Sequence, residues 1–111
     1  MKTATEDPVL QQFLGAIEPF AASCREIRLF GSRARDDFRP DSDYDILITL
    51  DQKDSAIKSK LYDAVIDVLL ATGKLISLKI YTVAEFDRLR LMLTPFTQNI
   101  VHEGISLGFN K

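Results

Sequence analysis

The chain has 111 residues, of which 46% are hydrophobic and 27% charged, a composition typical of a soluble globular protein. At roughly 100–200 residues per domain, we expect residues 1–111 to form a single domain. The 14 basic and 16 acidic residues give a formal net charge of -2, which argues against nucleic acid as a partner. The single cysteine, Cys24, excludes an intrachain disulfide, and no apolar run is typical of a signal peptide or a membrane span. We therefore expect a cytoplasmic protein with no membrane partner.

Helix caps and apolar spacing predict the first elements. Asp7 and Pro8 suit the N-cap and first position of a helix. Its apolar residues recur at helical spacing and predict a buried face of Leu10, Phe13, Leu14 and Ile17. Pro19 should end or kink this helix. A short strand over 26–30 follows, with Ile27 and Leu29 on one face, and it is broken at Gly31 and Ser32.

After a loop over 36–43, residues 44–50 form the clearest predicted strand. The next helix follows a polar turn over 51–54 and should end at Gly73. Its predicted buried face consists of Ile57, Leu61, Ala64, Val65, Val68 and Leu69. A third strand is predicted over 74–81.

Thr82 and Glu85 have the spacing of a capping box, which predicts a third helix with Phe86, Leu89 and Leu93 on its apolar face. A short fourth helix should begin at Thr94–Pro95 and end at Gly104, and residues 105–109 are a candidate final strand. This order of elements predicts an α/β (α+β) fold in which helices pack on a mixed sheet of three or four strands.

Two carboxylates lie close together at the start of the clearest strand. Because side chains alternate along a strand, Asp43 and Asp45 share a face with Leu47 and Thr49, whereas Tyr44, Ile46, Ile48 and Leu50 form an apolar face toward the core. Neighbouring carboxylates repel one another unless a divalent cation lies between them, and such oxygen ligands suit Mg²⁺ or Mn²⁺. The alternative is a solvated turn rich in capping residues.

The segment ten residues earlier favours the metal site over the solvated turn. Gly31 and Ser32 follow an apolar strand and can turn the backbone so that N–H groups and the serine hydroxyl face an anion. Arg33 and Arg35 add positive charge that suits a triphosphate. A phosphate-binding turn and an acidic pair are the two parts that phosphoryl or nucleotidyl transfer requires.

The pattern of Gly31-Ser32, ten intervening residues and Asp43-x-Asp45 resembles the signature of the DNA polymerase β-type nucleotidyltransferase superfamily, and more narrowly its minimal nucleotidyltransferase domains. The segment from Pro95 to Ile105 is similar to the end of such domains. The resemblance implies that Gly31 and Ser32 bind nucleotide phosphates. It also implies that Asp43 and Asp45 are catalytic and hold two divalent ions, while Arg33 and Arg35 match arginines that follow Gly-Ser in many members.

The same resemblance implies a function and partners. The implied reaction transfers a nucleoside monophosphate to a hydroxyl of a protein or small molecule. The donor is ATP, which gives AMP, or another nucleoside triphosphate. The implied partner is a small helical HEPN-domain protein, in some cases as toxin to this antitoxin; a homodimer is left open. The alternative function is a catalytically impaired module of the same fold that binds a helical HEPN-type partner.

The chain departs from the family pattern in two places. Asp36 stands where many relatives have glycine. In catalytically complete relatives the third strand supplies a third acid, whereas here alternation gives Ser77 and Lys79 as the residues that face the site. We therefore expect weak activity of the isolated chain and more activity when a partner contributes to the site.

Overall fold

The computed structural model describes residues 7–35 and 43–107, and of Ser32, Arg35 and Glu103 it describes the backbone alone. Five α-helices, one 3₁₀ helix and four strands are found in these residues. In chain order they are α1 (Pro8–Ile17), η2 (Glu18–Ser23), β1 (Cys24–Phe30), α2 (Ser32–Arg35), β2 (Tyr44–Leu50), α3 (Ser55–Thr72), β3 (Ile76–Thr82), α4 (Val83–Leu91), α5 (Pro95–Glu103) and β4 (Ile105–Ser106).

The strands form one mixed sheet in the order β3-β2-β1-β4. β1 pairs antiparallel with both β2 and β4, and β2 pairs in parallel with β3. The parallel pair needs a crossover, and α3 supplies it. The predicted α/β (α+β) fold with a mixed sheet of three or four strands is therefore confirmed.

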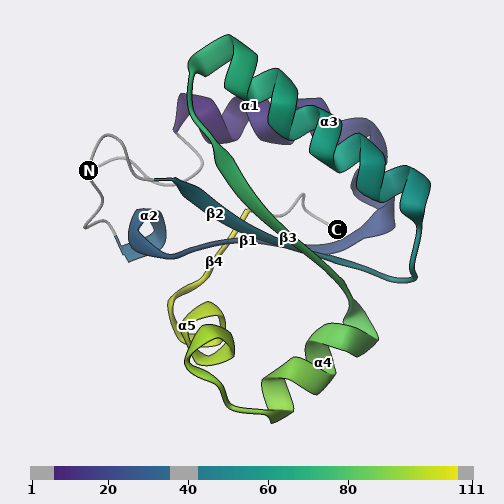
Figure 1. Ribbon diagram of the computed structural model, residues 1–111, viewed down its shortest axis with the longest axis vertical. Helices are drawn as coiled ribbons and strands as arrows, with labels where there is room; N and C mark the ends of the chain where they lie inside the picture. The colour runs from purple at the N-terminus through teal and green to yellow at the C-terminus, as the bar shows by residue number, and fades with distance from the viewer. Residues whose placement is uncertain (1–6, 36–42, 108–111) are drawn as a thin grey trace.

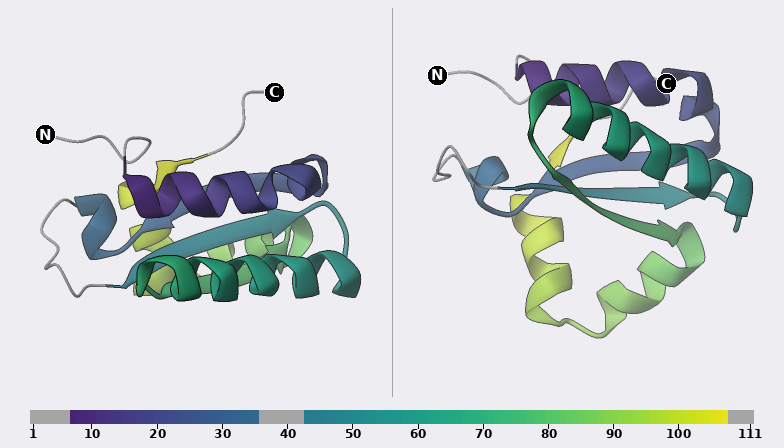
Figure 2. Two further views of the ribbon diagram at one scale, coloured as in Figure 1. Left: turned by 90° about the horizontal axis from the view of Figure 1, so that it is seen from above. Right: turned by 45° about the horizontal axis from the view of Figure 1, so that its top comes forward.

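Helices cover both faces of the sheet. Figures 1 and 2 show α1 and α3 side by side over one face, and α4 and α5 over the other. The first face forms the larger core, which includes the predicted apolar face of β2, namely Tyr44, Ile46, Ile48 and Leu50. A second, smaller core lies under α4 and α5 and consists of Phe30, Leu47, Phe86 and Ile100. Leu47 and Thr49, on the face of β2 predicted to carry the site, are thus buried.

Local hydrogen bonds explain where the helices begin and end. The carboxylate of Asp7 accepts hydrogen bonds from two backbone N–H groups of α1, and that of Asp54 does the same for α3. Thr82 and Glu85 form the predicted capping box of α4. Gly73 ends α3 in the left-handed conformation, with φ of 74°.

Several bounds differ from those predicted. The chain continues past Pro19 as the 3₁₀ helix η2, β1 begins at Cys24, and β3 runs two residues later than expected at its start. The four-residue helix α2 was not predicted, because it is too short to show an apolar period. Of the predicted final strand, Ile105–Ser106 is observed, and residues 108–109 lie outside the described part of the chain. Within the residues described, no helix has the length and apolar character that a bilayer crossing requires.

Candidate functional site

The end of β1 and the start of β2 meet at one edge of the sheet, where α2 also lies (Figure 1). Asp45, the second residue of β2, pairs in register with Phe30, the last residue of β1. Its side chain is half-buried, whereas Asp43, one residue before the strand, is exposed. On its other side, Asp45 pairs with Ser77 of β3. The pairing thus places this carboxylate between the turn after β1 and the third strand.

The turn at Gly31 packs directly against the Asp45 carboxylate. Gly31 has φ of 76°, a left-handed conformation that favours glycine. A Cβ atom at Gly31 would overlap Oδ2 of Asp45 and lie 3.2 Å from its carboxyl carbon. The Gly31 carbonyl accepts a hydrogen bond of 3.1 Å from Ala34 N–H, and α2 begins there. The glycine is therefore required both by its backbone conformation and by the carboxylate beside it.

The structure brings together some of the predicted site residues. Gly31 and Asp45 are in contact, and the backbone of Ser32 and Arg35 lies in α2 directly after the turn. The guanidinium carbon of Arg33 lies 4.1 Å from the centroid of the Tyr44 ring. That ring lies in the larger core, on the face of β2 opposite to Asp45. The predicted contact of Arg33 with a triphosphate stays a prediction, and Asp36 lies outside the described residues.

Tyr44 connects the site to the N-terminal helix, which the sequence analysis did not anticipate. Its hydroxyl donates a hydrogen bond of 2.9 Å to Oδ2 of Asp7, whose other oxygen caps α1. Burial raises the pKa of Tyr44 to about 12, the hydrogen bond and negative charge of Asp7 add to the effect, and the charge of Arg33 opposes it. Arg33, Tyr44 and Asp7 therefore link α2, β2 and α1 behind the two carboxylates.

The third strand presents a hydroxyl to the site where a carboxylate would complete it. Ser77 lies beside Asp45 in the parallel register, and Lys79 lies beside the buried Leu47 and is itself exposed. Ser77 and Lys79 do share the face of Asp45, as predicted from alternation. The register makes Ser77 the direct neighbour of the carboxylate and places Lys79 two residue pairs further along the strand.

The oxygen ligands at this site fit a hard divalent cation that is bound by the protein and by substrate phosphates at the same time. Among the described residues there is no group of three or more histidine, cysteine, aspartate or glutamate side chains that could hold a metal ion. Mg²⁺ does not need such a group, because in phosphoryl-transfer sites it binds one or two carboxylates, substrate phosphates and water. Asp43 and Asp45 supply two carboxylates at an open edge of the sheet. These residues therefore fit Mg²⁺ or Mn²⁺ together with a nucleotide.

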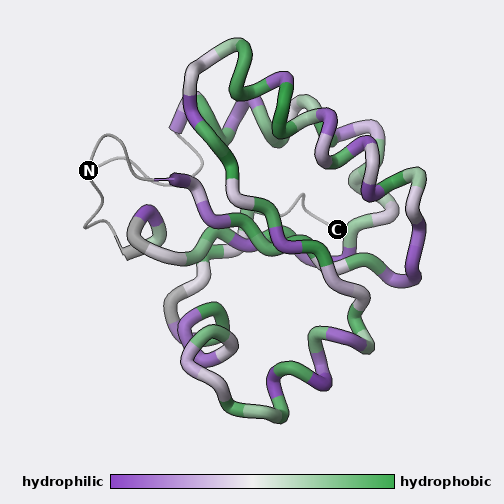
Figure 3. The backbone as a smooth tube through the Cα atoms, viewed as in Figure 1, coloured by the Kyte–Doolittle hydropathy of each residue, from purple (hydrophilic) through white to green (hydrophobic). Residues whose placement is uncertain are grey.

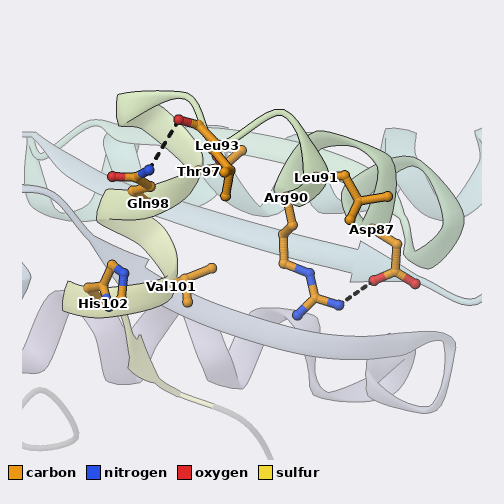
Figure 4. Close-up of a pocket in the computed structure, with 8 residues that line it drawn as sticks. All are labelled: Asp87, Arg90, Leu91, Leu93, Thr97, Gln98, Val101 and His102. Carbon is orange, nitrogen blue, oxygen red and sulfur yellow. Dashed lines mark hydrogen bonds and ion pairs between the residues drawn. The ribbon is translucent and has the colours of Figure 1, made fainter.

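Two larger pockets lie elsewhere and contain none of the predicted site residues. One of about 340 Å³, between α4 and α5, is drawn in Figure 4 and is lined by Asp87, Arg90, Leu91, Leu93, Thr97, Gln98, Val101 and His102. Its main charged groups are already paired, since Arg90 donates a hydrogen bond of 2.6 Å to Asp87. The other, of about 600 Å³, lies beside Leu50 and Thr82, at the opposite end of β2 from Asp45. Neither extends the site at Gly31 and Asp45.

Comparison with known proteins identifies the family. The nucleotidyltransferase domain family matches residues 12–105, which include the Gly31 turn, both aspartates, the strands β1 to β3 and the first residue of β4. The match covers most of the chain, which therefore belongs to the nucleotidyltransferase domain family. No curated protein matches the chain.

Solved structures show the same fold at low sequence identity. A toxin-antitoxin crystal structure with AMP-PNP is 17% identical, has a TM-score of 0.57, and is matched over 91% of this chain and 74% of the other. A candidate nucleotidyltransferase from Sulfolobus solfataricus is 18% identical, with a TM-score of 0.53 and coverage of 92% and 83%. At these identities the likeness supports the fold of the chain.

Proposed function

We propose that the protein transfers a nucleoside monophosphate, AMP from ATP, to a hydroxyl group of a protein or small molecule. The observation that carries the proposal is the contact between the Gly31 turn and the Asp45 carboxylate. The contact supports the proposal because nucleotidyl transfer needs a phosphate-binding turn next to a metal-binding carboxylate, the roles that we propose for Gly31 and Asp45. The similarity to a toxin-antitoxin structure containing AMP-PNP, an ATP analogue, supports ATP as the nucleotide.

In this proposal the residues of the chain bind and orient the nucleotide. Gly31, Ser32, Arg33 and Arg35 hold the phosphates, and Asp43 and Asp45 are the ligands of Mg²⁺ or Mn²⁺. The metal, when bound, supplies Lewis-acid stabilisation of the charge on the phosphates. The acceptor oxygen attacks the α-phosphorus. The bond from that phosphorus to the oxygen that bridges the α- and β-phosphates breaks, and pyrophosphate leaves. The proton of the acceptor hydroxyl passes to water. The position beside Asp45 on β3 is occupied by Ser77, so no carboxylate is there to accept that proton.

A second candidate function is a binding module of the same fold with impaired catalysis. The observation in its favour is the pairing of Asp45 with Ser77, which leaves the third strand without a carboxylate beside the site. Both candidates involve a partner, and we propose a small helical HEPN-domain protein as in a toxin-antitoxin pair, with a homodimer as the alternative. We further propose that residues 1–111 act as a single domain in the cytoplasm.

Nucleotide binding with and without metal tests the proposed site. Calorimetric titration of ATP into the full chain should show affinity that rises about tenfold or more when Mg²⁺ is added, because the metal offsets repulsion between the carboxylates and the triphosphate. Asp45→Asn should remove most of this gain. Asp63→Asn, which changes an exposed aspartate of α3, is the matched control and should keep it. Equal affinity with and without Mg²⁺ in the parent chain would contradict the metal site.

Transfer of label separates the enzyme from the binding module. With ATP labelled at the α-phosphate, the enzyme should attach label to the partner protein, and Asp45→Asn should abolish the labelling. The module should bind the partner equally well with and without that substitution and leave it unlabelled. Labelling by the parent chain and by Asp45→Asn at the same rate would contradict the role given to Asp45.

A further inference from the structure

The longest helix, α3, has apolar side chains on two opposite faces. Its inner face carries Leu61, Ala64, Val65 and Val68, all of them buried against the larger core. Its outer face carries four large side chains, which we call the outer stripe and whose exposed fractions are 42% for Tyr62, 52% for Ile66, 38% for Leu69 and 80% for Leu70. A helix that is apolar on a solvent-facing side as well as on its core side indicates an unfilled interface.

The outer stripe is continuous along the helix. Its members are separated by four, seven and eight residues from Tyr62, which is the spacing of side chains on one helix face. The sequence analysis had assigned Leu69 to the buried face, and the structure places it at the border of the exposed one. Figure 3 shows the apolar residues of α3 in green along the half of the helix that leads to β3. The stripe therefore offers a ridge against which an elongated apolar element can pack.

Two carboxylates border the outer stripe along one side. Asp63 and Asp67 are exposed and lie one helical turn apart, where like charges repel and destabilise a helix. The ammonium of Lys60, which precedes Asp63 by three residues, lies 5.0 Å from the centroid of the Phe20 ring. Among the ion pairs found in the described residues, none includes Asp63 or Asp67. A ligand that brings positive charge to this side would relieve their repulsion.

A second copy of the chain matches this charge less well than a cationic helix would. In an antiparallel pair a two-fold axis keeps equivalent flanks together, so both acid pairs would lie on one side of the interface. In a parallel pair, Asp63 and Asp67 of one copy would face the side of the other stripe that carries no aspartate. At the same height along the helix, that side carries Tyr62 and Leu69.

We propose that the outer stripe with Asp63 and Asp67 is a docking surface for an amphipathic helix of another protein, one with an apolar stripe flanked by lysine or arginine. A helix is the fitting partner because side-chain ridges of two helices interlock along their length. The flanking cations would pair with the two aspartates and fix the orientation of the partner. This proposal does not rest on nucleotidyl transfer and holds for an inactive module as well.

Two synthetic peptides of about 20 residues, a length that allows a stable helix, test the proposal on the full chain. Both carry the same leucine stripe, and they differ only in whether lysine or glutamate flanks it. In fluorescence anisotropy at low salt, the lysine peptide should bind about fivefold or more tightly than the glutamate peptide. The double substitution Asp63→Lys with Asp67→Lys should reverse this preference.

Substitutions in the stripe test the apolar half of the surface. Ile66→Gln with Leu70→Gln keeps good helix formers at exposed positions, so folding should be retained while binding of the lysine peptide falls about tenfold or more. The matched control is Leu91→Gln with Met92→Gln, which changes an exposed apolar pair outside α3 and should leave binding unchanged. Unaltered binding in the stripe variant would overturn the proposal. So would sedimentation showing a dimer of the parent chain that the stripe variant abolishes, since the occupant would then be a second copy.

Discussion

Gly31 and Gly73 share a left-handed backbone and differ in what surrounds them. Their φ values are 76° and 74°. The side of Gly31 where a Cβ would lie is filled by the Asp45 carboxylate, whereas a Cβ at Gly73 would meet nothing within 4 Å. The pair therefore separates the effect of backbone conformation from the effect of contact with the site.

We expect Gly31→Ala to lower the free energy of unfolding more than Gly73→Ala does. Gly73→Ala should cost about 1–2 kcal/mol for the left-handed conformation alone. Gly31→Ala adds the overlap with Asp45, so its cost should be larger by about 1 kcal/mol or more. Denaturant unfolding measures both, and in an Asp45→Ala background the two costs should become similar. Equal costs in the parent background would contradict the packing of the turn on the carboxylate.

Tyr44 should give the protein a stability that is lost at high pH. Its pKa is raised from 10.0 to about 12 in the folded state, first by burial and then by Asp7. A raised pKa in the folded state means that the stabilisation is complete below pH 10.0 and is lost as the pH rises to about 12. The loss should reach about 3 kcal/mol, since each pKa unit corresponds to about 1.4 kcal/mol.

The measurement is the free energy of unfolding of the parent and of Tyr44→Phe between pH 9 and pH 12, a window of about three units around the two pKa values. The variant keeps the ring under Arg33 and loses the hydroxyl, so it should be less stable at neutral pH by about 1–2 kcal/mol. The difference between the two proteins should shrink as the pH rises past 10.0 and reverse near pH 12, because the parent then loses more stability than its hydroxyl contributes at neutral pH. A constant difference across this range would show that the hydroxyl does not titrate as the structure indicates.

Among the elements, β3 decides how complete the candidate site is. Its parallel register with β2 places Ser77 beside Asp45 and Lys79 beside Leu47. Side chains of directly paired residues are closer than those two pairs further along, so Ser77 and Lys79 should respond differently to an added carboxylate.

We expect Ser77→Asp to tighten Mn²⁺ binding more than Lys79→Asp does. A carboxylate at Ser77 adds an oxygen ligand next to Asp45, and its effect should be about tenfold in affinity. Lys79→Asp removes one positive charge and adds a negative one further away, which should give a smaller, salt-sensitive gain. Electron paramagnetic resonance of Mn²⁺ measures both affinities. If Lys79→Asp has the larger effect, the metal lies further along the strands than Asp45.

Elements with local signals were predictable from the sequence. The caps at Asp7, Asp54 and Thr82 satisfy hydrogen bonds within three residues, so their pattern is visible without knowledge of the fold. Alternation likewise predicted the apolar face of β2. Burial of Leu47 could not be predicted in this way, because it depends on Phe86 and Ile100, which lie far along the chain.

The candidate site was predictable as a set of residues and only partly as a geometry. The spacing of Gly31 and Asp45 indicated both halves of the site, but their direct contact depends on antiparallel pairing of β1 with β2. The stacking of Arg33 on Tyr44 and the hydrogen bond to Asp7 join segments that are distant in the chain. No local pattern carries that information.

In the whole molecule, Leu107 joins the C-terminal segment to the larger core. It is buried, and its N–H donates a hydrogen bond of 2.8 Å to the Ile27 carbonyl beside the β4 pairing. We expect Leu107→Ala to lower the free energy of unfolding by about 2–4 kcal/mol. Ile105→Ala, at a neighbouring position that is 38% exposed, should cost less than about 1 kcal/mol. Thermal or denaturant unfolding compares them, and similar costs would contradict the burial of Leu107.

The division of the protein into two cores has a consequence for its synthesis on the ribosome. Apart from Leu107, the buried members of the larger core lie between Val9 and Leu78, whereas the smaller core also needs Phe86 and Ile100. At about 5–20 residues per second, translation from Thr82 to Leu107 takes roughly one to five seconds. During that interval β1, which ends just before Gly31, and β2, which carries Asp45, can already pair while Leu47 is still uncovered. We therefore expect the nascent chain to expose this apolar face until α4 and α5 fold over it.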